Sequence, residues 1–252
     1  MRAVVAAAVV VVLGAPRVAS AYRPFDQTDA DTAELDTVEL ELGPIKLTTG
    51  GGQVIYGPGG VFNYGFSDGW ELVFDYDAAI PLGDLGSSLV LTDLQVKHVL
   101  RDGSLQGRSG PSVALELGPL FPTIPTFPDE VGFDATLIVS QRWSDVTVHL
   151  NSEVAWERDR AVSATNGFII EGPQRWRLRP VAETYVSVER GASLYSGLVG
   201  AIYRWRSTVV FDAALRIIEN DQPGPPSTGP GTSNNGASGE LRVGLTWVIP
   251  TS

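Results

Sequence analysis

The stretch WELVFDYD at residues 70–77 decides the fold class. Its even-numbered positions are all apolar, whereas Glu71, Asp75 and Asp77 share the odd-numbered positions. Successive side chains of a β-strand point to opposite faces, so this alternation is the signature of a strand with one apolar and one polar face. The stretch therefore predicts a strand that separates two different environments.

The same period-two pattern recurs along the rest of the chain, while helical periodicity is scarce. Turn signals rich in Gly, Asp and Ser, such as residues 67–69 and 102–104, separate the alternating runs. The pattern predicts an all-β fold of twelve strands, at residues 37–48, 53–66, 69–80, 87–101, 110–119, 132–142, 146–158, 165–172, 175–189, 193–204, 207–219 and 239–249. A Gly-Pro-Gly-Gly sequence at residues 57–60 predicts a kink within the second of them.

Composition excludes several classes of protein. The 252 residues contain no cysteine, which rules out a disulfide scaffold, thiolate-bound zinc and iron–sulfur clusters. The formal net charge of −11 argues against a nucleic-acid partner, which requires a basic face. Hydrophobic residues make up 43% of the chain, too many for a disordered acidic protein. Composition leaves a soluble β protein and a membrane β-barrel.

Residues 1–21 read as a signal peptide. Arg2 supplies a positive start, an apolar run follows, and Ala19-Ser20-Ala21 offers the small residues that signal peptidase accepts. The apolar run is shorter than the roughly 20 residues that a spanning helix needs. We therefore expect export, and a mature domain at residues 22–252 that begins with a periplasmic arm at residues 22–36.

Three features favour a transmembrane barrel over a soluble sandwich, which alternation alone also fits. Many predicted strands reach ten residues or more, and spanning strands need about nine to eleven. Connection lengths follow the outer-membrane rule of short periplasmic turns and long outer loops. The short turns are residues 67–69, 143–145 and 204–207, and the long loops are residues 119–131, 158–165 and 220–238. This rule is not strict at every connection, which points to one miscounted strand.

The third feature is the placement of aromatic residues near predicted strand ends. Their amphipathic rings suit the interfacial girdles of a barrel, although ordinary core aromatics would also explain them. The residues are Tyr56, Tyr64, Trp70, Tyr76, Trp143, Trp156, Trp176, Trp205 and Trp247.

The polar face of the strands carries charges of both signs. In a barrel these side chains would face the lumen, where they could pair or meet water. They would contribute either to solute passage or only to pairing that holds neighbouring strands in register. We select as lumen-facing candidates Glu71, Asp75, Lys97, Arg142, Glu153, Arg177, Glu183 and Arg216.

Several short motifs resemble a family of outer-membrane β-barrels associated with the MetA pathway of phenol degradation. They lie at residues 22–30, 40–44, 63–72, 97–101, 114–119, 140–143 and 180–183, and so are spread over nearly the whole mature chain. The resemblance implies an outer-membrane barrel that transports hydrophobic or aromatic compounds. It implies no catalytic residues.

No motif for catalysis, cofactors or metals stands out. His149, Asn151 and Ser152 have the residue types of a membrane phospholipase, but Ser152 has the opposite parity, so we do not expect an enzyme. Asp26, Asp29 and Asp31 lack the spacing of an EF-hand, and a solvated acidic arm is the simpler interpretation.

The leading hypothesis is an outer-membrane barrel that acts as a passive channel for small molecules, with membrane lipid and a small solute as its partners. One alternative is a non-transporting structural or surface-binding barrel, whose Pro/Gly-rich loop at residues 220–238 would bind a partner. Another is a soluble secreted β-sandwich that serves as a binding module. Oligomeric state is not specified by any of these features.

Overall fold

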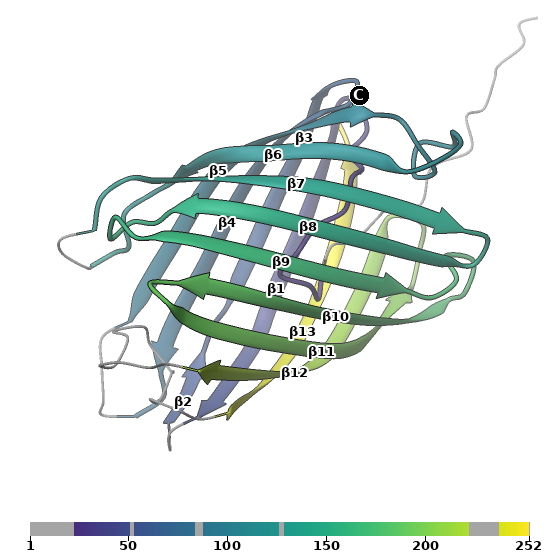
Figure 1. Cartoon of the computed structure of the whole chain (residues 1–252). Helices are drawn as coiled ribbons and strands as arrows, with labels where there is room; N and C mark the ends of the chain where they lie inside the picture. Colours follow the sequence, from purple (N-terminus) through teal and green to yellow (C-terminus); the bar gives the residue numbers. More distant parts are fainter. Residues whose placement is uncertain (1–22, 51–52, 84–87, 126–128, 222–236, 252) are drawn as a thin grey trace, which may run out of the picture.

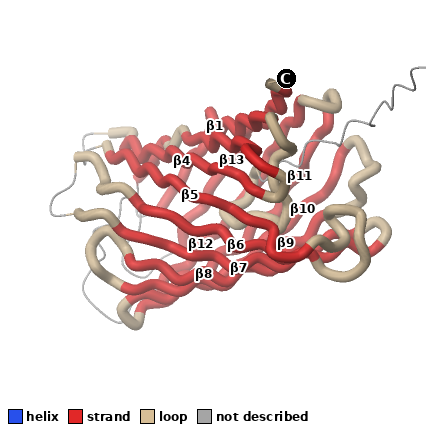
Figure 2. Tube along the Cα trace, turned by 90° about the horizontal axis from the view of Figure 1, so that it is seen from above, coloured by secondary structure: helices blue, strands red, loops and turns tan. Residues whose placement is uncertain are grey.

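The chain folds into one antiparallel sheet that closes into a barrel. The structure is a computed structural model, and it describes residues 23–50, 53–83, 88–125, 129–221 and 237–251. Neighbouring strands are hydrogen-bonded in chain order, and the last strand pairs with the first, which leaves no free edge. Figures 1 and 2 show strands throughout the wall and loops gathered at its two ends. The strands are β1 (Thr37–Gly50), β2 (Gln53–Tyr56), β3 (Gly59–Ser67), β4 (Trp70–Pro81), β5 (Leu89–Arg101), β6 (Ser112–Leu120), β7 (Gly132–Trp143), β8 (Val146–Trp156), β9 (Val162–Glu171), β10 (Leu178–Glu189), β11 (Ala192–Arg204), β12 (Val209–Asp221) and β13 (Ala237–Pro250).

The thirteen segments occupy twelve positions in the wall, as the sequence predicts. Both β2 and β3 lie between β1 and β4, so together they form one strand interrupted at Gly57 and Pro58. Proline has no backbone N–H to donate, which explains why the ladder breaks there. Around the break, Gly57 N donates to Lys46 O at 2.8 Å, and Pro58 O accepts from Ala78 N at 3.0 Å. The predicted kink in the second strand is confirmed.

Connection lengths differ between the two ends of the barrel. We call the end that holds Thr37 and Pro250 the N/C end, and the opposite end the far end. The short turns at residues 68–69, 144–145 and 205–208 all lie at the N/C end. The three predicted long loops start and finish at the far end, and residues 222–236 of the last one lie outside the described residues. The strand count was correct, so the suspected miscount is wrong. The departures from the rule are instead the long N/C-end connection at residues 102–111 and the two-residue far-end turn at residues 190–191.

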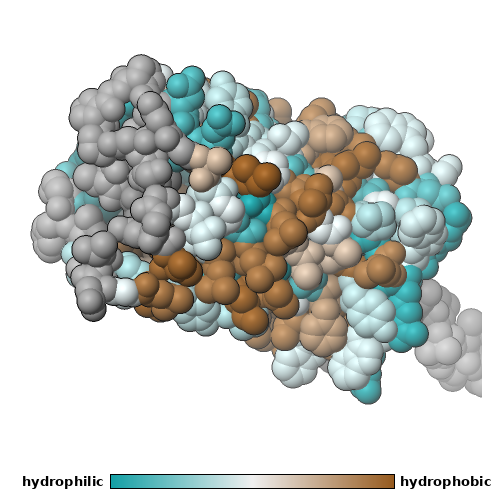
Figure 3. Space-filling view, turned by 90° about the horizontal axis from the view of Figure 1, so that it is seen from below, coloured by the Kyte–Doolittle hydropathy of each residue, from teal (hydrophilic) through white to brown (hydrophobic). Residues whose placement is uncertain are grey.

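The outer surface of the wall is apolar. Large hydrophobic side chains alternate outward along the strands, and residues such as Leu137, Val199 and Leu215 are 46, 64 and 61% exposed. Figure 3 shows a band of hydrophobic side chains across the middle of one outer face. A soluble sandwich would bury such side chains between two sheets, whereas a barrel turns them toward lipid. The β-sandwich alternative is therefore wrong.

Tryptophan marks one rim of this apolar surface. All six tryptophans are at least 38% exposed, which excludes ordinary core positions for them. Five of them lie at or near the N/C end of the wall: Trp70, Trp143, Trp176, Trp205 and Trp247. The sixth, Trp156, ends β8 at the far end. This distribution is that of an interfacial girdle. Among the described residues, no helix is long and apolar enough to cross a membrane.

The segment before β1 lies inside the barrel. We call residues 23–36 the N-terminal segment, and in Figure 1 it runs within the ring of strands, coloured dark purple. Pro24 and Ala30 are fully buried, and Phe25 packs on an apolar cluster of Val181, Ile202 and Val210 from the inner wall. The sequence predicted a solvated periplasmic arm here. The segment instead fills part of the lumen, because the inner wall supplies partners for its backbone. The predicted signal peptide at residues 1–21 lies outside the described residues.

Candidate functional site: the barrel lumen

Side chains of the inner wall hydrogen-bond the backbone of the N-terminal segment. A chain buried away from water must find partners for its N–H groups. Glu183 accepts hydrogen bonds from the amides of Asp26 and Gln27, at 3.0 and 2.9 Å. The wall residues Glu41, Asn151, Ser140 and Glu71 accept from the amides of Arg23, Thr28, Ala30 and Ala33, in that order. Polar residues on the inner face thus do for this segment what a neighbouring strand does in a sheet.

Asn151 and Lys97 of the wall fix the middle of the segment. Asn151 Nδ2 donates to the carbonyl of Thr28 at 2.8 Å, while its Oδ1 accepts from the Thr28 amide at 3.3 Å. Lys97, fully buried, donates from Nζ to Thr28 Oγ1 at 3.0 Å. The long N/C-end connection adds Gln106, which donates to the carbonyl of Ala30 at 2.9 Å. The segment is therefore held from several strands and one loop.

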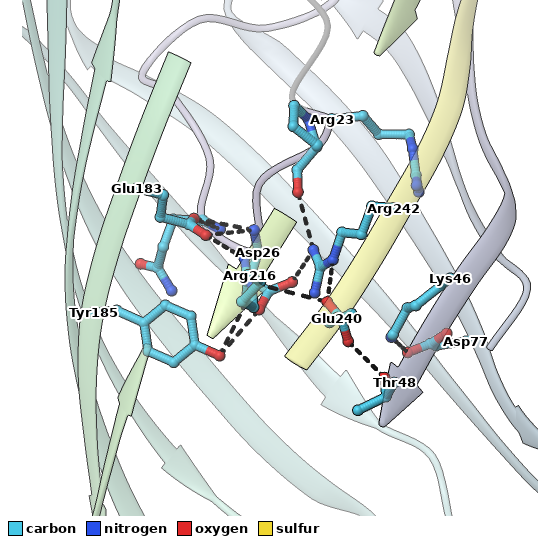
Figure 4. A network of polar contacts seen from close by, with 12 residues as sticks. Arg23, Asp26, Lys46, Thr48, Asp77, Glu183, Tyr185, Arg216, Glu240 and Arg242 are labelled. Atoms are coloured by element: carbon cyan, nitrogen blue, oxygen red, sulfur yellow. Dashed lines mark hydrogen bonds and ion pairs between the residues drawn. The ribbon is translucent and has the colours of Figure 1, made fainter. Parts of the chain in front are cut away.

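An ion-pair network fixes the start of the segment, as Figure 4 shows. We call Asp26, Glu183, Arg216, Glu240 and Arg242 the anchor cluster. The fully buried Arg216 pairs with Asp26 and Glu183, and Arg242 pairs with Asp26 at 2.5 Å and with Glu240. Because every charge in the cluster has an opposite charge beside it, the network meets the condition under which buried ions are tolerated.

Neighbouring groups complete the anchor cluster. Tyr185 Oη donates to Asp26 Oδ2 at 3.0 Å, and the Arg216 guanidinium lies 5.3 Å from the Tyr185 ring centroid. Arg23 lies 3.6 Å from Asp212, in a space that Gly43 and Gly244 leave open. A Cβ at either glycine would displace the Arg23 guanidinium, and at Gly244 it would also lie 2.8 Å from the carbonyl oxygen of Leu42.

A Ser–His–Glu chain lies near the middle of the segment, and sequence reasoning missed it. Ser140 Oγ is 2.8 Å from His149 Nδ1, and His149 Nε2 is 3.1 Å from Glu171 Oε1. These are the residue types of a hydrolase triad. However, Ser140 is fully buried, and its Oγ already accepts the Ala30 amide at 2.9 Å. The buried Ser140 hydroxyl is closed to a substrate in this structure. The Ser140–His149–Glu171 hydrogen bonds therefore serve to hold the N-terminal segment.

The acidic residues of the segment do not gather into a calcium site. Asp26 is committed to two arginines, and Asp31 Oδ1 accepts from Gln106 at 3.0 Å. Burial raises the pKa of Asp31 above its ordinary value, and the neighbouring Asp29 raises it further. In the described part of the chain, no group of three or more His, Asp or Glu residues is arranged to hold a metal ion.

Beside the first part of the segment, whose Arg23 and residues 25–28 help to line it, the lumen holds a cavity of about 370 Å³. It extends toward the far end, where Asp134 and Glu157 line it, and acidic side chains outnumber basic ones in its wall. Ten acidic and four basic side chains line it. Asp77 pairs with Lys46, and Asp93 pairs with Arg158. Within the described residues, Asp75, Asp134 and Glu153 have no ion-pair partner. We call Asp75, Asp93, Glu116, Asp134 and Glu153 the acidic cavity.

Six of the eight predicted lumen residues form three pairs, and Arg142 and Arg177 stand apart from them. Glu183 and Arg216 belong to the anchor cluster, and Glu71 and Lys97 hold the N-terminal segment. Asp75 and Glu153 line the cavity. Arg142 is half-buried on the inner face near the N/C end, with its Nε 3.3 Å from Thr147 Oγ1.

Arg177 does not face the lumen. It is exposed and precedes β10, which begins at Leu178 rather than at residue 175 as predicted. Its guanidinium lies 5.6 Å from the Tyr203 ring centroid, and its Nε is 3.4 Å from the carbonyl oxygen of Arg204. The prediction of a lumen position for Arg177 is wrong, because strand parity does not extend into the preceding turn.

Comparison with solved structures identifies the fold. An outer membrane channel from Pseudomonas putida F1 superposes with a TM-score of 0.58, covering 89% of this chain and 100% of that chain at 12% identity. This is the fold of an outer-membrane β-barrel. An anion-selective porin from Comamonas acidovorans gives 0.45, with 86 and 100% coverage at 8% identity. A loop-deletion mutant of the outer membrane protein OmpT of Vibrio cholerae gives 0.41, with 87 and 100% coverage at 10% identity. No protein-family model matches the sequence, and the comparison with curated proteins gives no match.

Proposed function

We propose that this chain is an exported outer-membrane barrel through which small solutes pass passively. The single observation that carries the proposal is a charged cavity within a closed wall whose outer surface is apolar. An apolar exterior with a polar interior is the arrangement of membrane barrels that contain an aqueous path. The signal peptide at residues 1–21 would direct export, and the girdle of tryptophans would set the depth in the membrane.

The N-terminal segment limits what passes. Barrels of about eight strands are filled by side chains, while open pores are typical at roughly 16–18 strands. A twelve-position barrel lies between these sizes, and the segment occupies part of its lumen. We therefore propose a narrow path with room for small solutes only. Polar and charged residues together make up most of the cavity lining, which favours hydrophilic solutes over the hydrophobic or aromatic compounds that the family resemblance implies.

A non-transporting structural barrel is the second candidate. The observation that favours it is the dense set of contacts between the segment and the wall, including the fully buried Arg216 and Lys97. In that case the inner charges would serve stability alone.

Planar-bilayer recording of the refolded protein separates these two candidates. We expect discrete single-channel steps, and swelling of proteoliposomes in solutions of small sugars or amino acids. Absence of both single-channel steps and solute uptake would reject the channel. Cell fractionation tests location separately, since an outer-membrane protein requires detergent for extraction.

A further inference from the structure

The charge of the cavity is not balanced by the residues around it. Of its lining residues, ten are acidic and four are basic, and three of those four basic residues already pair with Asp212, Asp77 or Asp93. The fourth, Arg242, belongs to the anchor cluster. Behind the lining, the buried Lys97 lies 4.0 Å from Glu116. Acidic side chains still outnumber these cations, so the excess negative charge faces the cavity.

Strand register brings carboxylates close to one another. Asp75 on β4 lies directly opposite Asp93 on β5. Glu116 and Glu153 both lie opposite Thr136, on its two sides, which places them two strand spacings, or about 10 Å, apart. Like charges directly opposite each other are destabilising in a sheet. A cation or a bound proton would relieve this repulsion.

Two buried carboxylate oxygens lack partners and line the same cavity. Asp134 is 6% exposed; its Oδ2 accepts from Gln95 at 2.6 Å, while Oδ1 has no hydrogen-bond partner in the described structure. Glu71 is 1% exposed; one of its oxygens accepts the Ala33 amide, and Oε1 has no partner among the described residues. A buried oxygen without a donor is costly, and electrostatic attraction to a cation in the cavity would offset part of that cost.

We propose that this cavity is a cation-selective vestibule, which concentrates monovalent cations, inorganic or organic ammonium, and repels anions. The specificity-determining residues are Asp75, Asp134 and Glu153. Rings of carboxylates select cations in channels by this mechanism. The described residues form no compact group that could hold a metal ion, so the selection acts on diffusing cations rather than on one tightly bound ion. The inference rests on the proposed channel function. Its tests are chosen so that failure of the vestibule can be told apart from failure of the channel.

The first test reads the potential of the cavity without any conductance. The chain has no cysteine, so Val61→Cys introduces a single thiol, on the cavity lining and directly opposite Asp75. We compare its rates of reaction with a methanethiosulfonate that carries a trimethylammonium group and one that carries a sulfonate. Ser67→Cys, exposed at the N/C end, gives the reference ratio. Clefts lined by one sign of charge raise local counter-ion concentration by about 10- to 1,000-fold, so we expect at least about a 10-fold preference for the cationic reagent.

Matched charge variants make the labelling result specific. In the Val61→Cys background, Asp75→Asn, Asp134→Asn and Glu153→Gln together should bring the ratio toward that of Ser67→Cys. The control Asp68→Asn, Asp102→Asn and Glu219→Gln removes the same charge from exposed positions outside the lining and should leave it high. No preference, or no reaction of either reagent at Val61→Cys, would overturn the proposal.

The second test is the reversal potential in a KCl gradient across a planar bilayer. We expect the wild type and the control triple variant to prefer K⁺, and the cavity triple variant to lose that preference. A wild type that conducts without preference, or prefers Cl⁻, would overturn the vestibule while leaving the channel intact. Absence of any conductance would reject the proposed function, and the labelling ratio would then decide the vestibule alone.

Discussion

The anchor cluster and the acidic cavity lie in the same lumen but differ in charge balance: one contains ions of both signs, the other an excess of carboxylates. In the anchor cluster, Arg216 and Arg242 face three carboxylates, and each ion has a partner within 4 Å. In the acidic cavity, Asp93 and Glu116 each have one cationic partner, whereas Asp75, Asp134 and Glu153 have no ion-pair partner among the described residues. Paired charges are suited to holding a structure together, whereas an excess of carboxylates is suited to attracting diffusing cations.

This difference gives the two regions separate functions within one barrel. The anchor cluster fixes the N-terminal segment and so sets the width of the path. The acidic cavity sets the sign of the ions that reach it. Variants that alter one region should therefore leave the property of the other unchanged.

The largest effect is expected from Arg216→Met. Its loss leaves Glu183 buried without its arginine, and breaking a buried ion pair in this way costs about 3–5 kcal/mol of unfolding free energy. Urea titration of the detergent-folded protein, followed by its change in gel mobility, measures this. Asp75→Asn in the acidic cavity is the counterpart and should be neutral or stabilising, since it removes repulsion with Asp93. Equal destabilisation by the two variants would contradict the comparison.

A charge introduced on the apolar exterior should destabilise the barrel to a similar extent on both of its sides. Leu215→Arg on β12 and Leu137→Arg on β7 place a cation near the middle of an outward strand face. Each should cost about 2–4 kcal/mol of unfolding free energy in lipid. Val162→Arg at the far-end start of β9 should cost about 0–1 kcal/mol, because it lies near the membrane surface. A low cost at both central positions would argue against a lipid-facing wall.

A neutral contact should hold the segment less firmly than the ion pairs do. Asn151→Ala leaves the amide and carbonyl of Thr28 without their partner, which costs about 1–3 kcal/mol. Hydrogen–deuterium exchange should become faster at residues 26–33, with the strands unaffected. Unchanged exchange in this segment would show that Asn151 does not contribute to holding it.

The smallest effect is expected for an exposed ion pair. Arg175 and Asp145 lie 2.7 Å apart at the N/C end with side chains 70 and 38% exposed. Arg175→Ala should change the unfolding free energy by less than about 1 kcal/mol, since solvent screens such pairs. A loss comparable to that of Arg216→Met would mean that burial does not set the strength of the anchor cluster.

The strands were predictable from sequence because their signal is local. Period-two alternation placed every strand end within three residues, and parity correctly turned Glu71, Lys97 and Arg216 inward. Parity failed at Arg177, which lies in a turn. Gly57-Pro58 marked the break in the second strand because proline removes a donor there.

The position of the N-terminal segment could not be predicted in the same way. The segment has no periodicity, and its partners are distant: Asp26 contacts Glu183, 157 residues away, and Arg242, 216 residues away. The same limit hid the Ser140–His149–Glu171 chain, since only the register of β7, β8 and β9 brings these residues together. The sequence predicted inward charges of both signs, but the surplus of carboxylates around the cavity and the pairing among them depend on this tertiary placement.

Single-channel recording of Asp26→Ala tests most directly whether the anchor cluster sets the width of the path while the acidic cavity sets its ion preference. Asp26 is the segment's own contribution to the anchor cluster, while Arg216 keeps Glu183 and Arg242 keeps Glu240. The barrel should therefore remain folded while the segment loses its main ionic contact, and hydrogen bonds to charged groups contribute about 1.5–3 kcal/mol each. We predict a larger unitary conductance with the cation preference of the wild type. An unchanged conductance, or a larger one that has lost the cation preference, would contradict the account.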